Sequence, residues 1–352
     1  MDTDSTSGFK ASTKPSSSTS ELFGGTYARG GVADAVSDSA WVQALLDVEA
    51  ALGGDRLQAS DIDIAALGRE GAEHASVVVP LAQRFAGTHA GATSQDILDT
   101  ALMLVARRAL EPLLTDARAA ADAAAALALA HRDTPVMGRT LLQDAAPVSL
   151  GLRAAGWMTG IDEAREAFAG VELAVQMGGP VGQRDPVVAD RVAAALGLAA
   201  PVLPWHADRV RTARLACALG VLAGALAKPA RDATLMPEAR EGVPGRGGSS
   251  ALPHKRNPVA AVSVLACTRR VPGLVTTVLA GMESELERAA GAWQAEWGTL
   301  TDLLRLTGSA AAWAQDLLGH LEIDAPPMAT TPDLGAAAEL VDRALAAHAA
   351  RP

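Results

Sequence analysis

The chain has 352 residues and a formal net charge of −10, and its composition is 49% hydrophobic but only 3% aromatic. An acidic chain lacks the basic face typical of nucleic-acid-binding proteins, although a local cluster of cations can still bind an anionic small molecule. Alanine and leucine outnumber the β-branched and aromatic residues that strands favour, so the composition predicts an all-α protein.

The N-terminal segment begins with a polar stretch. Residues 1–20 are rich in serine and threonine and have no apolar core of the kind a secretory signal carries, which predicts a disordered tail. Residues 35–52 place apolar side chains at helical spacing and predict a first helix. Short helices are expected up to residue 92, so residues 21–92 are interpreted as an N-terminal helical domain.

Long helices dominate the centre of the chain. They are predicted over 93–132, 147–176, 206–236, 258–290 and 293–320, with a shorter one over 334–348. Pro112 predicts a bend or a join, and Pro229 a kink. Three starts carry recognisable signals: Thr93 or Ser94 as a cap, Pro147 at the first turn, and Asn257 as a cap before Pro258. We interpret 93–320 as a central bundle domain and 321–352 as a reduced C-terminal segment.

Residues 214–227 form a helix with no clear polar face, which predicts burial on every side and hence a homo-oligomer. Cys217 and Cys267 lie in similar apolar runs and are expected to be buried, unpaired thiols in a reducing compartment. No histidine or cysteine cluster has metal-ligand spacing, and no stretch suits a lipid bilayer. The sequence therefore predicts a soluble cytoplasmic protein with no metal, no membrane partner and no nucleic-acid partner.

Three polar regions interrupt this apolar pattern: residues 88–96 (the first region), 138–147 (the second) and 245–258 (the third). Each is expected just before a long helix, where free backbone N–H groups form an anion site. Helix capping alone could explain the first region, and a polar helix start the second. The third region concentrates glycines, serines, two cations and an amide within a few positions, which is typical of a binding loop.

Other polar and aromatic residues have structural interpretations. His206 is expected to be a packing or helix-start histidine. Trp293 and Trp297 are four residues apart and should pack on one helical face. His254 lies within the third region and could be a donor that faces a ligand.

The third region carries a resemblance to a known family. Residues 248–257 read GSSALPHKRN and match the pattern Gly-Ser-Ser-x-x-Pro-x-Lys-x-Asn, the signature loop of the fumarase/aspartase superfamily. Within this superfamily, GATSQDILDT (91–100), GRTLLQ (138–143) and ERAAGAWQAEW (287–297) are similar to the bacterial 3-carboxy-cis,cis-muconate cycloisomerases. The resemblance extends from about residue 22 to the end.

The resemblance implies a helical homotetramer whose central bundle is shared by four chains, with each active site built from regions of three subunits. It implies a small polycarboxylate substrate and no cofactor. Ser249 matches the superfamily's catalytic base, with Lys255 lowering the pKa of its hydroxyl and Lys255 and Asn257 binding a carboxylate. The other side chains expected to bind substrate are His89, Thr93, Ser94, Asp96, Arg139, Thr140, Gln143, Ser250, His254 and Arg256.

The chain departs from the family in two ways. Leu141 stands where fumarase and the succinate lyases place a histidine that shuttles protons, and Ala90 replaces a frequent aromatic residue. The chain is also shorter than typical members, near 53–88, 180–187, 231–245 and at the C-terminus. Three hypotheses remain: a cycloisomerase acting on 3-carboxy-cis,cis-muconate, a β-elimination lyase acting on another substituted succinate of the nitrosuccinate or adenylosuccinate type, and a non-catalytic homologue.

Overall fold

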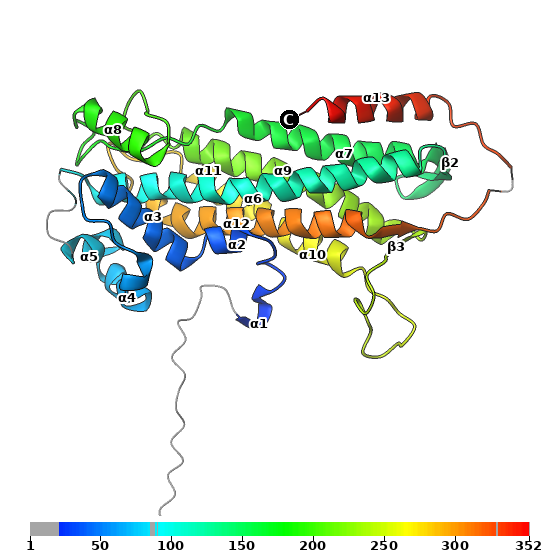
Figure 1. Ribbon diagram of the computed structural model, residues 1–352, viewed down its shortest axis with the longest axis horizontal. Helices are drawn as coiled ribbons and strands as arrows, with labels where there is room; N and C mark the ends of the chain where they lie inside the picture. The colour runs from blue at the N-terminus through cyan, green and yellow to red at the C-terminus, as the bar shows by residue number, and fades with distance from the viewer. Residues whose placement is uncertain (1–20, 85–88, 90, 329, 352) are drawn as a thin grey trace, which may run out of the picture.

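The structure is a computed structural model that describes residues 21–84, 89, 91–328 and 330–351. The tail over 1–20 and Ala90 lie outside the described residues. Four long helices run side by side: α6 (Ser94–Ala130), α7 (Leu150–Glu166), α9 (Val210–Leu235) and α12 (Ala292–Gly319) (Figure 1). The apolar faces of these helices form the core. The prediction of an all-α protein built on a bundle of long helices is confirmed.

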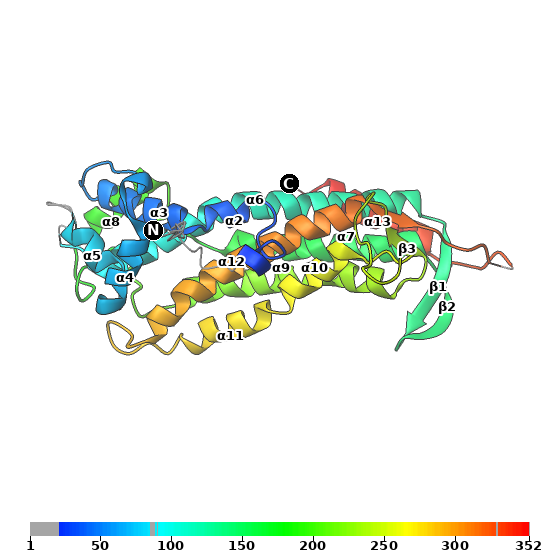
Figure 2. The ribbon, with the colours of Figure 1, turned by 90° about the horizontal axis from the view of Figure 1, so that it is seen from below.

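Shorter helices surround the bundle. α10 (Val259–Thr268) and α11 (Val271–Ala280) pack on α12 and α9, and α13 (Ala337–Ala349) packs on α7 and α6 (Figure 2). The helices α3 (Asp38–Ala51), α4 (Ile64–His74), α5 (Val78–Gln83) and α8 (Pro186–Leu196) gather at the end of the bundle where α6 begins. Two very short helices, α1 (Glu21–Gly24) and α2 (Val32–Ala35), precede them, and 3-10 turns cover Ala59–Asp61 and Ala167–Gly170. The boundaries proposed for three domains stay a prediction.

Each of the two internal prolines lies within a continuous helix. α6 continues through Pro112 for 37 residues, and α9 continues through Pro229 for 26 residues. Packing against neighbouring helices therefore outweighs the lost backbone hydrogen bond, and the join predicted at Pro112 is wrong. The predicted cap at the start of α6 is confirmed, because Thr93 is its N-cap residue and its backbone N–H donates to the Asp96 side chain at 3.0 Å.

The second region is a β-hairpin rather than a helix start. β1 (Pro135–Thr140) pairs with β2 (Gln143–Ser149) in antiparallel register, and the hairpin projects beyond the end of the bundle (Figure 2). Leu141 and Leu142 form its turn with positive φ angles of 52° and 64°. Pro147 lies in β2, where an edge strand tolerates its missing N–H. The helix predicted from Pro147 begins instead at Leu150, where the Ser149 hydroxyl accepts from the Leu152 N–H.

Another predicted helix is interrupted and ends early. The helix expected over 258–290 is split into α10 and α11, because Pro272 occupies the first turn of α11 and cannot donate to the preceding turn. The predicted Asn257 cap is wrong: Pro258 is the N-cap residue of α10, and the Asn257 amide bonds within the third region. Two short strands, β3 (Ala239–Glu241) and β4 (Leu321–Ile323), also form an antiparallel pair.

One face of α9 is not covered within the chain. Arg214, Cys217, Val221 and Gly224 are exposed at spacings of three and four residues, so the predicted burial of Cys217 is wrong for the single chain, whereas Cys267 is buried. Among the described residues, Val210–Leu235 and Val259–Ala280 are long and apolar enough to cross a membrane by length and composition alone. Core helices of soluble proteins meet the same criterion, so this is weak evidence for a membrane protein.

Candidate active site

The three polar regions lie at the two ends of the bundle. The first precedes α6 and the second follows it, and α6 spans about 55 Å at 1.5 Å per residue. The third region lies between β3 and α10, at the same end as the hairpin (Figure 1). Within the residues that the structure describes, no hydrogen bond or ion pair links one region to another. One chain therefore does not bring the predicted site residues together.

In the first region, His89 is held by a buried carboxylate. Its backbone N–H donates to Glu49 at 2.9 Å, and its Nδ1 lies 2.9 Å from the other oxygen of Glu49, which is buried in α3. His89 has a positive φ of 66°, and this paired contact stabilises that conformation. Thr93 and Ser94 remain partly exposed beside it at the start of α6, so they can reach a ligand.

Asp96 has a structural environment. Its buried carboxylate accepts from the backbone N–H groups of Gly178 and Gly179, each at 2.8 Å, and lies 2.8 Å from Nε2 of His206. Burial raises the pKa of Asp96, but the hydrogen bonds from His206, Gly178 and Thr93 outweigh it and lower the pKa below its usual value. Asp96 therefore positions residues 176–179 against α6, and the interpretation of His206 as a packing residue is confirmed.

A buried ion cluster lies one turn further along α6. The Arg209 guanidinium donates to Asp99 at 2.7 Å and to Glu296 at 2.5 Å, and all three side chains are buried. Trp293 also donates to Asp99, and its ring packs edge-on against Trp297 with centroids 4.9 Å apart. The predicted packing of the two tryptophans is confirmed. The sequence alone could not predict these ion pairs, because Asp99 and Glu296 are 110 and 87 positions from Arg209 along the chain.

In the second region, Arg139 is already paired. Its guanidinium donates to Asp144 at 3.0 Å and to the Leu235 carbonyl at the end of α9, which fixes the hairpin to the bundle. Thr140 and Gln143 pair across the turn and are exposed. Leu141 is 96% exposed at the tip, an unusual position for a leucine in a single chain.

The third region is closed at its base by a short strap. The backbone N–H and the side-chain amide of Asn257 both donate to the Gly247 carbonyl, at 2.7 and 3.1 Å. Gly247 has a φ of +78°, and a Cβ there would lie 2.2 Å from the Asn257 carbonyl oxygen. The residue just before the signature therefore needs to be glycine, for both its backbone conformation and its close approach. Asn257 therefore holds the loop in shape through its backbone and its side chain.

Within the loop, the Ser249 Oγ accepts from the backbone N–H groups of Ala251 at 3.3 Å and Leu252 at 3.1 Å. Donors placed in this way stabilise negative charge on the oxygen. Lys255 is exposed and makes no side-chain hydrogen bond or ion pair to another described residue. Ser250, His254 and Arg256 are also exposed, and Arg256 donates to the carbonyls of Pro253 and Lys255. The two backbone donors to Ser249 are a feature that sequence reasoning missed.

The start of α10 is not a free anion site. Both oxygens of Glu241 accept from the backbone N–H groups of Ala260 and Ala261, at 3.1 and 3.0 Å. The predicted anion site at this helix start is therefore wrong, because a carboxylate of the chain already occupies it. Arg246 lies 3.4 Å from Glu241 and donates to Asp316 at 2.5 Å. A cavity of about 250 Å³ lies beside these groups and is lined by Arg256 and Asn257.

We expect Gly247→Ala to lower catalytic turnover by about 100-fold while leaving thermal stability almost unchanged, because it breaks the strap and moves Ser249 in an exposed loop. Gly245 is the matched control. It has a similar φ of +77°, but a Cβ there meets nothing within 4 Å. Turnover that falls equally in Gly245→Ala would show that backbone strain, and not the strap, controls the loop.

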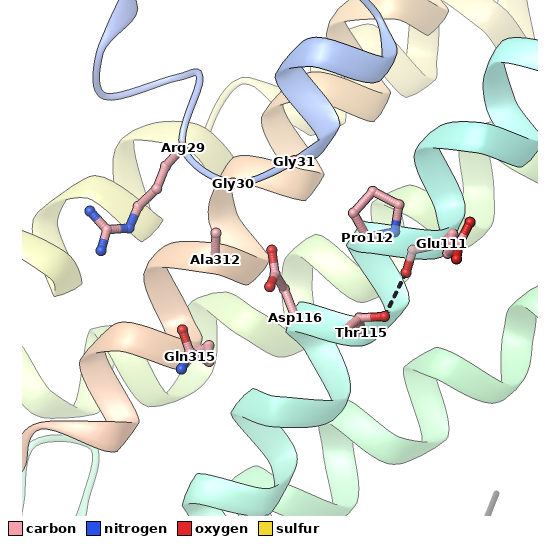
Figure 3. A pocket seen from close by; sticks show the side chains of 9 residues that line it. All are labelled: Arg29, Gly30, Gly31, Glu111, Pro112, Thr115, Asp116, Ala312 and Gln315. Atoms are coloured by element: carbon pink, nitrogen blue, oxygen red, sulfur yellow. Dashed lines mark hydrogen bonds between the residues drawn. The ribbon is translucent and has the colours of Figure 1, made fainter.

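A second cavity, of about 560 Å³, opens midway along the bundle, away from all three regions. It is lined by Arg29, Gly30, Gly31, Glu111, Pro112, Thr115, Asp116, Ala312 and Gln315 (Figure 3). Burial raises the pKa of Asp116, and the charge of Arg29 offsets part of that rise. Arg29 itself donates to Asp316 at 2.9 Å and stacks on Trp313.

Asp116→Asn should stabilise the protein slightly at neutral pH, by at most about 0.5 kcal/mol for this half-exposed group. Because folding raises the pKa of this carboxyl, its protonated form favours the folded state, and stability is lost as pH rises through the folded-state pKa. The gain should therefore be present at pH 7 and absent at pH 3, in thermal melts of both proteins. Glu111→Gln, which removes a carboxylate five residues away on α6, is the control variant. An equal gain at both pH values would contradict this account.

Comparison with known proteins places the chain in a family. A family model described as lyase matches residues 81–273, which is more than half of the chain. The chain belongs to the lyase family of the fumarase/aspartase superfamily. This lyase-family chain is 40% identical to a 3-carboxy-cis,cis-muconate cycloisomerase of Bradyrhizobium diazoefficiens over 303 residues, which cover 78% of the chain and 67% of that protein. It is 37% identical to a nitrosuccinate lyase of Streptomyces davaonensis, with 85% and 74% covered.

The fold of this lyase-family chain also matches solved structures. The 3-carboxy-cis,cis-muconate lactonizing enzyme from Pseudomonas putida superposes with a TM-score of 0.80 at 33% identity, over 93% of this chain and 79% of that one. The chain spans 67%, 64% and 56% of the lengths of three curated cycloisomerases that it matches. Among the described residues, no group of three or more His, Cys, Asp or Glu side chains could hold a metal ion, so metal-independent chemistry stays a prediction.

Proposed function

We propose that this lyase-family chain is a cycloisomerase that closes 3-carboxy-cis,cis-muconate to a carboxymuconolactone. The observation that carries the proposal is the third region. Its strap between Gly247 and Asn257 closes a loop in which Ser249 accepts from two backbone donors and Lys255 and Arg256 are exposed. The relatives named as cycloisomerases and the matching lactonizing enzyme support this substrate and a place in aromatic catabolism.

The chemistry is an intramolecular addition, which is a β-elimination read in reverse. One substrate carboxylate oxygen bonds to the alkene carbon β to another carboxylate, and the π electrons move onto the α carbon and that carboxylate. The Ser249 hydroxyl gives its proton to the α carbon, and solvent restores the hydroxyl. Lys255, Arg256 and the backbone donors stabilise the negative charge that develops. Because the nucleophile is a carboxylate, no acid is needed at the position of Leu141.

The active unit we propose is a homotetramer with sites shared between subunits. Three observations support it. The 55 Å length of α6 separates the first region from the second, and the third region lies at the same end of the bundle as the second. The exposed face of α9 leaves apolar surface uncovered, and the exposed Leu141 and Leu142 can pack against a neighbouring chain. In such an assembly His89, Thr93 and Ser94 face the third region of another chain, together with Thr140 and Gln143 of a third. We also propose a soluble cytoplasmic location and no cofactor.

A second candidate is a β-elimination lyase acting on nitrosuccinate. It is favoured by coverage, because the nitrosuccinate lyase matches more of this chain and more of its own length than the Bradyrhizobium cycloisomerase does. Ser249 would then remove the proton α to a carboxylate, and nitrite would leave to give fumarate. Nitrite leaves without protonation, so Leu141 does not separate the two candidates.

One pair of assays separates them. Purified protein is given 3-carboxy-cis,cis-muconate while the muconate absorbance is followed, and nitrosuccinate while nitrite is measured. We expect rapid loss of muconate absorbance with little nitrite. Fast nitrite release without muconate turnover would establish the lyase instead. If a correctly assembled tetramer catalyses neither reaction, that result favours a non-catalytic homologue.

A further inference from the structure

The third region is held by the rest of its chain only at its two ends. It extends away from the bundle between β3 and α10, beside the end of α12 (Figure 1). Among the described residues, every hydrogen bond of residues 247–257 stays within that range, and no ion pair leaves it. The position of Ser249 relative to the bundle therefore depends on the two stems of the loop, residues 241–246 and 258–261.

Arg246 fixes the first stem to α12. It directly precedes Gly247, whose carbonyl accepts both donors of Asn257 in the strap. The Arg246 guanidinium donates to Asp316 of α12 at 2.5 Å, and the Asp316 side chain is only 7% exposed. A charged hydrogen bond that is shielded from solvent is stronger than an exposed ion pair. The residue before the strap is thus attached to one of the long helices of the core.

The same guanidinium reaches the second stem through Glu241. Arg246 lies 3.4 Å from the Glu241 carboxylate, which is buried. Glu241 in turn accepts from the backbone N–H groups of Ala260 and Ala261 at the start of α10. Arg246 therefore lies between two buried carboxylates, one on the bundle and one that caps the helix after the loop. A single side chain connects both stems of the loop to α12.

Asp316 has a second arginine partner that does not contact the loop. Arg29 donates to Asp316 at 2.9 Å and stacks on Trp313, and Nδ1 of His320 lies 3.0 Å from the same carboxylate. In the part of the chain that the structure describes, no hydrogen bond or ion pair joins Arg29 to residues 241–261. Removing either arginine leaves Asp316 with the other one. A difference between the two variants therefore reports on the loop and not on the charge of Asp316.

We propose that Arg246 is a positioning residue for the third region. It holds both stems of the loop on α12 and so sets where Ser249 and its two backbone donors meet the substrate. Arg246 itself does not contact the substrate. The kinetic part of this inference rests on the proposed function, because it takes Ser249 as the group that transfers the proton. The structural part does not, because the loop is held in the same way whatever reaction it serves.

Turnover by three variants tests the kinetic part. Arg246→Met should lower kcat about 30-fold, because a misplacement of about 1 Å at the reacting groups costs up to about 100-fold in rate. Arg246→Lys keeps a cation for Asp316 but cannot span two carboxylates, and it should lose about fivefold. Arg29→Met should stay within about twofold of the parent. Equal losses in Arg29→Met and Arg246→Met would overturn the proposal, because the charge of Asp316 would then control activity.

A double variant with Gly247→Ala separates a shared effect on the loop from two unrelated losses. Independent losses of about 30-fold and about 100-fold would multiply to about 3,000-fold. If both substitutions displace the same loop, the double variant should lose no more than about threefold beyond Gly247→Ala alone. A fully multiplicative loss would contradict the positioning role of Arg246.

Amide hydrogen exchange tests the structural part without any enzymatic activity. The Asn257 N–H donates to the Gly247 carbonyl at 2.7 Å, so protection of residues 247–257 reports the strap. We expect exchange there to be about tenfold faster in Arg246→Met than in the parent, and unchanged in Arg29→Met. Unchanged exchange in Arg246→Met would overturn the inference. If the parent converts neither 3-carboxy-cis,cis-muconate nor nitrosuccinate, faster exchange in Arg246→Met still supports the positioning role, and only the proposed function fails.

Every variant should keep the helical circular dichroism and the oligomer mass of the parent, because Asp316 retains one arginine in each. Arg246→Gln, which keeps a hydrogen-bond donor for a carboxylate, replaces Arg246→Met in all three measurements if the methionine variant does not assemble. The same results are expected from it.

Discussion

Ser249→Ala should reduce turnover of 3-carboxy-cis,cis-muconate by about 10³-fold, because it removes the only group proposed to carry the transferred proton. The structure gives a reason for the choice of this hydroxyl over its neighbour. The Ser249 Oγ accepts from two backbone N–H groups that stabilise an alkoxide, whereas Ser250 is exposed and accepts none among the described residues. Turnover at saturating substrate is the quantity to measure.

The comparison variant is Ser250→Ala, for which we expect a loss of about tenfold or less. Both variants should keep the helical circular dichroism and the oligomer mass of the parent, because the loop is exposed and its strap involves neither side chain. An equal loss of turnover in the two variants would contradict the assignment of Ser249 as the proton donor. A Ser249→Ala protein with full activity would exclude proton transfer by this loop.

Arg209→Met should destabilise the fold by about 3–5 kcal/mol, because it leaves the Asp99 and Glu296 carboxylates buried without a cation. That loss is a large part of the 5–15 kcal/mol typical of a folded protein. Urea unfolding followed by circular dichroism measures it. The cluster joins α6 to α12 and to the start of α9, so the unfolding midpoint of the whole bundle should fall.

The loss in Arg209→Met should depend on pH. The pKa of Glu296 is raised, because the effect of burial exceeds the opposing effect of Arg209. Removing Arg209 therefore raises the folded-state pKa of Glu296 further. A raised carboxyl pKa favours the folded state when protonated, so the variant should lose more stability at pH 8 than at pH 5. Replacing all three charged residues with apolar ones (Asp99→Leu, Arg209→Met, Glu296→Leu) should recover much of the stability. A loss that is independent of pH would point to packing instead of charge.

The sequence predicted the long helices well because their apolar periodicity and caps are local signals. Thr93 with Asp96 identified the start of α6, and the apolar run over 293–320 identified α12 to within one residue at each end. The hairpin was missed because Leu141 and Leu142 occupy its turn, where glycine or asparagine would normally announce positive φ angles. The split between α10 and α11 was missed because apolar residues continue on both sides of Pro272, which occupies the first turn of α11.

The candidate site was predicted in part. The third region was identifiable because a dense polar loop stands out against an apolar chain. Contacts between distant positions were not identifiable: Glu241 caps α10 from 19 residues away, and Glu49 holds His89 from 40 residues away. Asp96 shows the same limit: the resemblance to the family implied a ligand contact, whereas its contacts with Gly178, Gly179 and His206 give it a packing role.

The length of α6 has a consequence for how much protein a solution must contain. Because the first and second polar regions of one chain are separated by the length of α6, only the assembled oligomer can be active. A separated subunit contains only parts of several active sites. Specific activity should then fall steeply below the concentration at which subunits dissociate and return on reconcentration. A cell with few copies of this chain would gain activity abruptly, at a threshold of abundance, and not in proportion to each molecule it makes.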